Sequence, residues 1–183
     1  MLINEIVKIL GLLGLGSIID RILTYLLNKK GKENEEKLLV YRELNGIRIL
    51  LRQLFVSRTE AYIFSDYYEL RYKLTKNEWD FKEAERWMHK SEDYVIKITD
   101  CLKDLFSILA ISSRLFKNNS EIQFLIARLY KYKTITINKP PEKISIEKLD
   151  QWKTKAIKES QNFIEIEYGK SIENLIKKIS KTL

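Results

Sequence analysis

The only two prolines of the chain, Pro140 and Pro141, are adjacent, so no proline precedes residue 140. Proline interrupts helices because it lacks an amide hydrogen and its ring clashes with the preceding turn. The chain also has only six glycines, whereas a fold of many short strands needs frequent turn residues. Because 45% of the residues are hydrophobic, the chain can bury a core. These features predict an all-α protein with long helices.

Residues 35–74 form the first long pattern, in which apolar residues recur at spacings of four and three. The same line continues with polar and aromatic residues in its second half, so one face of one helix is expected to carry Val40, Leu44, Ile47, Leu51, Leu54, Arg58, Ala61, Ser65, Tyr68 and Tyr72. Because Arg58 lies on this otherwise inward face, we expect it to pair with a carboxylate inside the bundle.

Three further helices follow. "TKNE" at 75–78 has the form of a capping box and predicts a helix over 79–117, whose inward row contains Ala84, Trp87, Ser91, Tyr94, Ile98, Cys101 or Leu102, Leu105, Leu109 and Ser112. "KNNS" at 117–120 caps a shorter helix over 121–133, and Ser145 caps a last helix over 146–181. Short connections favour an antiparallel four-helix bundle with three long helices, placed behind an N-terminal apolar helix of membrane type.

The N-terminal apolar segment runs from Ile6 to Leu27 and carries two different stripes. Its 22 residues would make a helix of about 33 Å, against about 30 Å for the hydrocarbon layer of a bilayer. One stripe is wholly apolar and contains Leu12, Leu15, Ile19, Ile22 and Leu26. The other contains Gly14, Ser17, Arg21, Thr24 and Asn28. Small and hydroxyl residues allow helices to approach closely in a membrane, and Asp20 can neutralise the adjacent Arg21.

Three interpretations of this segment remain open at the level of sequence: a self-associating helix that spans the bilayer, a helix that lies on the membrane, and a helix packed inside a soluble bundle. "NKKGK" at 28–32 follows as a cytoplasmic anchor would require. We therefore divide the chain into an anchor helix at 1–28, a charged hinge at 29–34 around Gly31, and a bundle domain at 35–183. The first interpretation places the protein at the cell membrane with its bundle in the cytoplasm, and the third makes it cytoplasmic.

"GLLGLGSIIDRILTYLLNKK" at 11–30, followed by a charged helix, resembles a group of small, mostly uncharacterised bacterial proteins. These have an N-terminal membrane-anchor helix and a cytoplasmic helical domain, and they often occur on mobile elements or in antiviral islands. The resemblance covers about the first 40 residues and implies a bacterial membrane protein of antiviral defence. It implies no functional residue.

Residues that could carry chemistry are few. His89 is the only histidine; Glu85 and Asp93 share its helical face at spacings of four, which ion pairing on a solvated face explains. Cys101 is the only cysteine, and its apolar neighbours indicate a buried, unreactive thiol. We therefore expect no catalytic residues, no cofactor and no metal, and we interpret the chain as a non-enzymatic protein.

Basic and aromatic residues alternate in "RLYKYK", which contains Arg128, Tyr130, Lys131, Tyr132 and Lys133. Such surfaces can stack bases and neutralise phosphates, and the net charge of +8 also favours an anionic neighbour. The sequence thus predicts a membrane-anchored homo-oligomer that presents its bundle to a protein partner, as an effector or scaffold. The alternative is a soluble helical adaptor or a nucleic-acid-binding protein.

Overall fold

The computed structural model describes residues 16–131, 137, 139, 140 and 144–183, with side chains from Arg21 onward. Every element in these ranges is helical: α2 (Gly16–Thr75), α3 (Glu78–Leu115), α4 (Ser120–Leu129), α5 (Ile146–Ile164), a π-helix η1 (Glu165–Gly169) and α6 (Lys170–Ser180). Because α5, η1 and α6 follow one another without a break, the described residues form four helical segments, three of them long. The predicted all-α class is confirmed.

The described chain divides into two compact units, and the boundary along the sequence falls between Leu39 and Val40. The first contains the beginning of α2, and the second contains residues 40–182. Within residues 16–131 and 144–183, no helix is both long enough and apolar enough to cross a membrane. The predicted membrane-type helix is thus not found there, and residues 6–15 of that segment lie outside the described residues.

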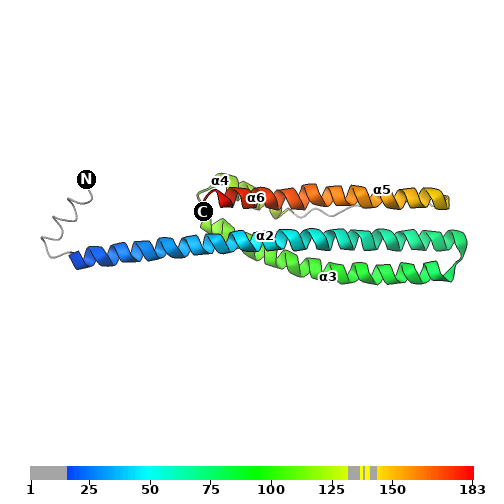
Figure 1. Cartoon of the computed structure of the whole chain (residues 1–183), viewed down its shortest axis with the longest axis horizontal. Coiled ribbons are helices and arrows are strands. Elements are labelled where there is room, and N and C mark those ends of the chain that lie inside the picture. Colours follow the sequence, from blue (N-terminus) through cyan, green and yellow to red (C-terminus); the bar gives the residue numbers. More distant parts are fainter. Residues whose placement is uncertain (1–15, 132–136, 138, 141–143) are drawn as a thin grey trace. The chain divides into compact units, whose positions relative to one another are not determined.

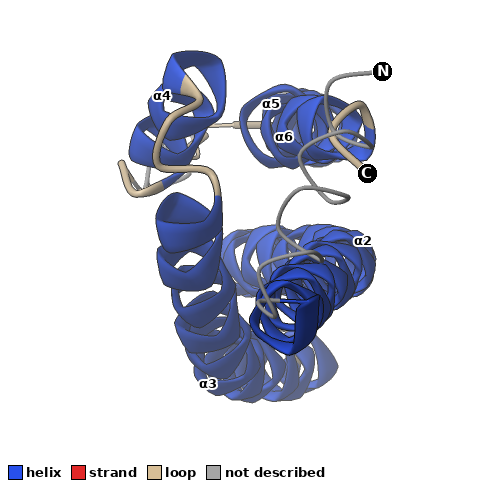
Figure 2. Cartoon of the chain, turned by 90° about the vertical axis from the view of Figure 1, so that its left-hand side faces the viewer, coloured by secondary structure: helices blue, strands red, loops and turns tan. Residues whose placement is uncertain are grey.

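The second unit is an antiparallel bundle, in which α2 packs on both α3 and the α5–α6 helix (Figure 1). Ser65 on α2 donates a hydrogen bond to the carbonyl of Ala84 on α3 at 3.0 Å. Polar contacts between α2 and the last helix show that the two helices are antiparallel, because residue numbers rise along one helix as they fall along the other. The contacts are Arg48–Glu173, Arg52–Glu165, Glu60–Gln161 and Tyr67–Asp150. α4 folds back from the end of α3 and packs on α6 (Figure 2).

The predicted seam of α2 is the centre of the core. Of its predicted residues, Val40, Leu44 and Leu51 are fully buried, Ile47 is 7% exposed and Leu54 is partly buried. Phe55, which lies outside the predicted row, is also fully buried. They pack with the apolar rows of the other helices in one continuous cluster, which includes Ile98, Cys101, Leu105, Leu109, Phe116, Ile122, Ile126, Ile164, Tyr168, Ile172, Leu175, Ile176 and Ile179. This core occupies the half of the bundle that contains α4 and α6. Most residues of the predicted inward rows of α2 and α3 are buried or partly buried, so the apolar periodicity correctly predicted the inward faces of these two helices.

The helix caps differ in part from the predicted ones. Asn77, not Thr75, is the N-cap of α3, and its side chain accepts a hydrogen bond from the amide of Trp79. The Thr75 hydroxyl instead contacts the Asp80 carboxylate at 3.0 Å, so the predicted Thr75–Glu78 capping box is wrong. Asn119 caps α4 and Ser145 caps α5, as asparagine and serine side chains readily do.

The backbone is helical where we predicted a charged hinge at 29–34, because α2 continues through it. A glycine inside a helix costs only about 1 kcal/mol relative to alanine. Pairs of opposite charge four residues apart partly offset that cost, and Glu33 and Lys37 form one such pair at 2.8 Å. A single Gly31 among such pairs is therefore insufficient to end the helix.

The π-helix η1 interrupts the last helix at a point where its buried residues are four apart. Ala156, Ser160, Ile164, Tyr168 and Ile172 are all buried. In a regular α-helix each four-residue step turns about 40° too far, so these four steps would drift by about 160°. The wider turn of η1 contains one extra residue, and this offsets part of the drift. The buried rows before and after η1 therefore both face the core.

Candidate functional site

The first candidate site is the exposed apolar segment, defined as the described side chains 21–28 of α2. All of these side chains are exposed. The large apolar ones are Ile22 (53% exposed), Leu23 (47%), Tyr25 (65%), Leu26 (53%) and Leu27 (68%). Because each helical residue turns about 100°, these five side chains cover a sector of roughly 200°. A helix that packs on one neighbour usually has a narrower apolar face.

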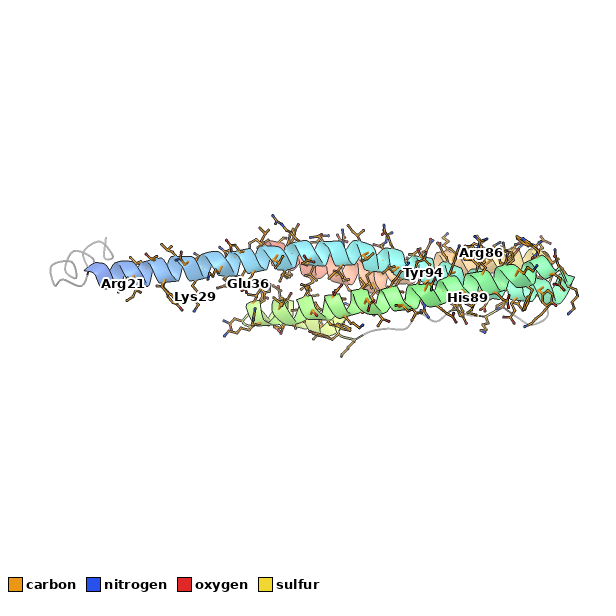
Figure 3. All side chains as sticks on the ribbon, turned by 90° about the horizontal axis from the view of Figure 1, so that it is seen from below. Arg21, Lys29, Glu36, Arg86, His89 and Tyr94 are labelled. Carbon is orange, nitrogen blue, oxygen red and sulfur yellow. The ribbon has the colours of Figure 1, made fainter. Side chains whose placement is uncertain are left out.

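The remaining sector of this segment carries the predicted polar stripe. Arg21 and Thr24 are exposed there, together with Asn28, and Figure 3 shows Arg21 near the beginning of the described α2. Ser17 lies in α2, as does Asp20, but their side chains are outside the described set, and Gly14 lies outside the described residues altogether. The structure therefore locates two of the five predicted self-association residues, Arg21 and Thr24, and places both in the polar sector.

Charged residues follow the apolar segment directly. Lys29, Lys30 and Lys32 are exposed on the same helix. The next turns carry acidic residues, and the neighbouring Lys37 lowers the pKa of Glu33 through a hydrogen bond and charge attraction. The helix thus changes within one turn from an apolar to a cationic surface.

The second candidate site is the predicted basic and aromatic stretch at the end of α4. Arg128, Tyr130 and Lys131 are exposed, while Tyr132 and Lys133 lie outside the described residues. Arg128 and Lys131 border a pocket of about 90 Å³ whose other walls are Leu129, Glu167, Tyr168 and Ser171. Arg128 and Lys131 therefore lie close to the π-helix. Sequence spacing could not have indicated this proximity.

Tyr130 is already engaged within the bundle. Its ring stacks on Phe106 with 5.5 Å between centroids, and its hydroxyl donates to the Phe106 carbonyl at 3.4 Å. One face of the ring is therefore covered, which reduces the surface it offers for base stacking. This packing weakens the nucleic-acid interpretation of the stretch without removing its two cations.

A third feature, an aromatic cluster near the α2–α3 turn, was not predicted as a unit. Phe64 stacks on Trp87 at 4.8 Å, Tyr68 meets Trp79 edge-on at 5.5 Å, and further pairs join Tyr67 to Tyr68 and Tyr72 to Phe81. The tyrosine-rich stretch 61–73 was a signal for it. Most of these pairs join α2 to α3, and Tyr67 is nearly fully buried, whereas Trp79 and Phe81 remain about half exposed.

Polar groups are buried around this cluster. Tyr67 donates a hydrogen bond to Asp150 at 2.7 Å and thereby lowers the pKa of that carboxyl. Asp80 is completely buried and lies 3.5 Å from Arg71. Burial raises the pKa of Asp66, although the positive charge of Lys139 opposes the shift. These contacts connect α2 to α3 and α5 in the half of the bundle that lacks the apolar core.

Arg58 differs from our expectation. Its side chain is half-buried, and its Nε atom is buried without a hydrogen-bond partner in the described part of the chain. The predicted pairing with a carboxylate is therefore not seen there. Arg71, on the same helix, instead lies 3.5 Å from the buried carboxylate of Asp80.

The residues considered for chemistry do not assemble into a site. The His89 side chain is 79% exposed on α3 and its Nδ1 atom lies 3.3 Å from Glu92; Figure 3 shows it on the helix surface near Arg86. No group of three potential metal ligands occurs among the described residues. Cys101 is buried, and burial raises the pKa of its thiol, which disfavours the reactive thiolate.

Comparisons with known proteins add no assignment: no family model, curated protein or solved structure matches the chain.

Proposed function

We propose that the protein is a membrane-attached, self-associating helical protein whose bundle is presented to a protein partner. Residues 6–27 attach it to the bilayer, and the stripe of Gly14, Ser17, Arg21 and Thr24 forms the contact between copies. The observation that carries this proposal is the exposed apolar segment. Its roughly 200° apolar sector matches a surrounding solvent of lipid better than a single protein neighbour.

Energy supports the same proposal. Full burial of a large apolar side chain contributes about 1.5–3 kcal/mol, and the five apolar side chains of the segment are 47–68% exposed. Transfer of their exposed halves out of water would contribute on the order of 5 kcal/mol. The three lysines that follow suit the anionic headgroups at the bilayer surface, so hydrophobic and electrostatic terms favour the same position.

Self-association is proposed from the narrow polar sector. A lone arginine is costly next to lipid tails and is favourable only when it faces protein, water or an acidic group. Contact between copies along this sector would place Arg21 away from lipid and beside a hydroxyl-bearing stripe, where helices can approach closely. The oligomer is then the state in which both sectors have suitable neighbours.

The decisive experiment is flotation of the full chain with lipid vesicles, together with cell fractionation and a carbonate wash. We expect the wild type to float and to resist the wash. Leu26→Lys places a charge in the apolar sector and should reduce flotation strongly. The matched control Thr24→Lys adds the same charge to the polar sector and should reduce flotation much less. Recovery of the wild type in the soluble fraction would refute membrane attachment and favour the soluble adaptor.

Oligomer formation needs its own measurement. Gly14→Leu puts a bulky side chain into the proposed contact but suits lipid, so it should lower cross-linking in detergent while flotation persists. Leu12→Ala, on the apolar stripe, is the control and should leave cross-linking unchanged. If both variants cross-link as the wild type does, the polar stripe is not the contact.

A further inference from the structure

The charge of the bundle is distributed unevenly along its length. The half made by residues 40–57, 97–131 and 160–182 contains 13 basic and 7 acidic residues, a net charge of +6. The half made by residues 58–96 and 144–159 contains 11 basic and 12 acidic residues, a net charge of −1. We call these the basic half and the neutral half. Such an asymmetry attracts anions to one half of the bundle only.

Four lysines of the basic half lie at or just beyond the ends of α3 and α6. Lys117 lies in the turn after α3 and Lys181 follows α6; both are exposed, and neither has a carboxylate within ion-pair distance in the described part of the bundle. Lys177 and Lys178 pair with Glu173 and Glu121. Lys181 also contributes to the lowered pKa of Glu121, which places it near that pair.

Phe124 adds an apolar element to this cationic surface. It is 69% exposed, the highest value among the large apolar side chains described. Together with Leu125 it borders a hollow that Ser120, Glu121 and Lys178 complete. An exposed aromatic ring that borders the same hollow as a lysine side chain suits the boundary between headgroups and acyl chains.

We propose that this basic end, defined by Lys117, Phe124, Lys177, Lys178 and Lys181, docks on the anionic headgroups of a membrane surface. The inference rests on the proposed membrane attachment, which brings the surface within reach. Twelve residues lie between Leu27 and Val40, a span of about 20 Å as a helix and of at most about 45 Å when extended. Cations are attracted to an anionic membrane surface. Because Lys177 and Lys178 are paired with carboxylates, Lys117 and Lys181 supply most of the attraction that biases the bundle toward the bilayer.

The test compares two dye positions on the full chain bound to vesicles. Asn118→Cys puts a dye at the basic end and Met88→Cys puts one on the neutral half; neither replacement changes the charge. Cys101 is buried and stays unlabelled under native conditions. A quencher on the lipid headgroups should quench the dye at 118 several-fold more than the dye at 88 on phosphatidylglycerol vesicles. Salt should reduce the difference, and phosphatidylcholine vesicles should largely abolish it.

Charge reversal identifies the residues. Lys117→Glu with Lys181→Glu should remove most of the extra quenching at position 118, and the matched control, Lys76→Glu with Lys82→Glu on the neutral half, should preserve it. Equal quenching of the two dyes on chains that float overturns this inference and leaves the proposed function intact. Failure of the wild type to float overturns both. Tight, salt-sensitive binding of a single-stranded oligonucleotide that Lys117→Glu with Lys181→Glu abolishes, without differential quenching by lipid, would assign the surface to nucleic acid instead.

Discussion

One helix, α2, contains two stretches with similar numbers of leucines and isoleucines but different surroundings. In residues 21–39 the large apolar side chains are exposed. In residues 40–55 most of them belong to the core, although Ile49 and Leu50 are exposed. In the first stretch apolar residues spread over more than half of the helix circumference. In the second stretch the buried apolar residues repeat along one face. Hydrophobic content alone therefore does not build a core. The angular distribution decides whether the rest of the chain can cover the side chains.

The sharpest test of this difference exchanges a leucine for alanine in each stretch. Leu44 is fully buried whereas Leu26 is 53% exposed. Leu44→Ala should lower the free energy of unfolding by about 3–5 kcal/mol, because it removes transfer energy and leaves a cavity. Leu26→Ala should change it by less than about 0.5 kcal/mol. Urea unfolding of both variants in detergent checks the pair, and equal losses would mean that residues 21–39 are packed in a core.

A second pair of variants removes one tyrosine hydroxyl from each of the two units of the chain. Tyr67→Phe deletes the hydrogen bond to Asp150 and should cost about 1–2 kcal/mol, whereas Tyr25→Phe, on an exposed ring, should cost nothing measurable. The pKa of Asp150 is lowered in the folded state, and the hydrogen bond from Tyr67 is the largest cause. That stabilisation is present above the unfolded pKa and disappears as pH falls through the folded pKa.

The deficit of Tyr67→Phe should therefore shrink as the solution is acidified through the carboxyl range. Thermal unfolding of both tyrosine variants at neutral and acidic pH measures this change. A deficit of Tyr67→Phe that stays constant with pH would show that the lost hydroxyl acts through packing and not through the carboxylate.

The smallest expected effects come from the two described glycines that have open space around them. An alanine methyl would meet no atom within 4 Å at Gly31 or Gly46, so only helix propensity is changed. Gly46→Ala should raise the free energy of unfolding of the bundle by up to about 1 kcal/mol. Gly31→Ala should increase helix content by circular dichroism and leave bundle unfolding unchanged. If Gly31→Ala stabilised the bundle as much as Gly46→Ala does, residues 21–39 would unfold together with the bundle as one cooperative unit.

The sequence was informative where a single periodicity decides the structure. Val40, Leu44, Ile47 and Leu51 were predicted to turn inward because they repeat at helical spacing, and all four are buried. The predicted hinge around Gly31 is wrong as a break in the helix, since one glycine costs little against the surrounding turns. The N-cap of α3 is Asn77 and not the predicted Thr75. Both residue types can cap a helix, and the two lie only two positions apart.

Contacts between distant residues were beyond prediction from a single sequence. The partner of Tyr67 lies 83 positions away, and the stacking of Tyr130 on Phe106 joins helices whose register no local pattern specifies. The pocket beside Arg128 likewise depends on where the π-helix falls. Of the predicted apolar segment at 6–27, the structure describes the side chains of residues 21–27 and shows them exposed. The choice between lipid and protein as their neighbour rests on the proposed experiments.

The π-helix has a consequence for how the length of this chain can vary. Elsewhere in the long helices, loss of one residue would rotate everything beyond it by about 100° and turn polar side chains into the core. Loss of one residue from 165–169 would instead convert the wide turn into an ordinary one, with the buried rows on both sides still facing inward. Relatives one residue shorter at this point are therefore expected to keep the same bundle, and an alignment gap there would mark a tolerated deletion.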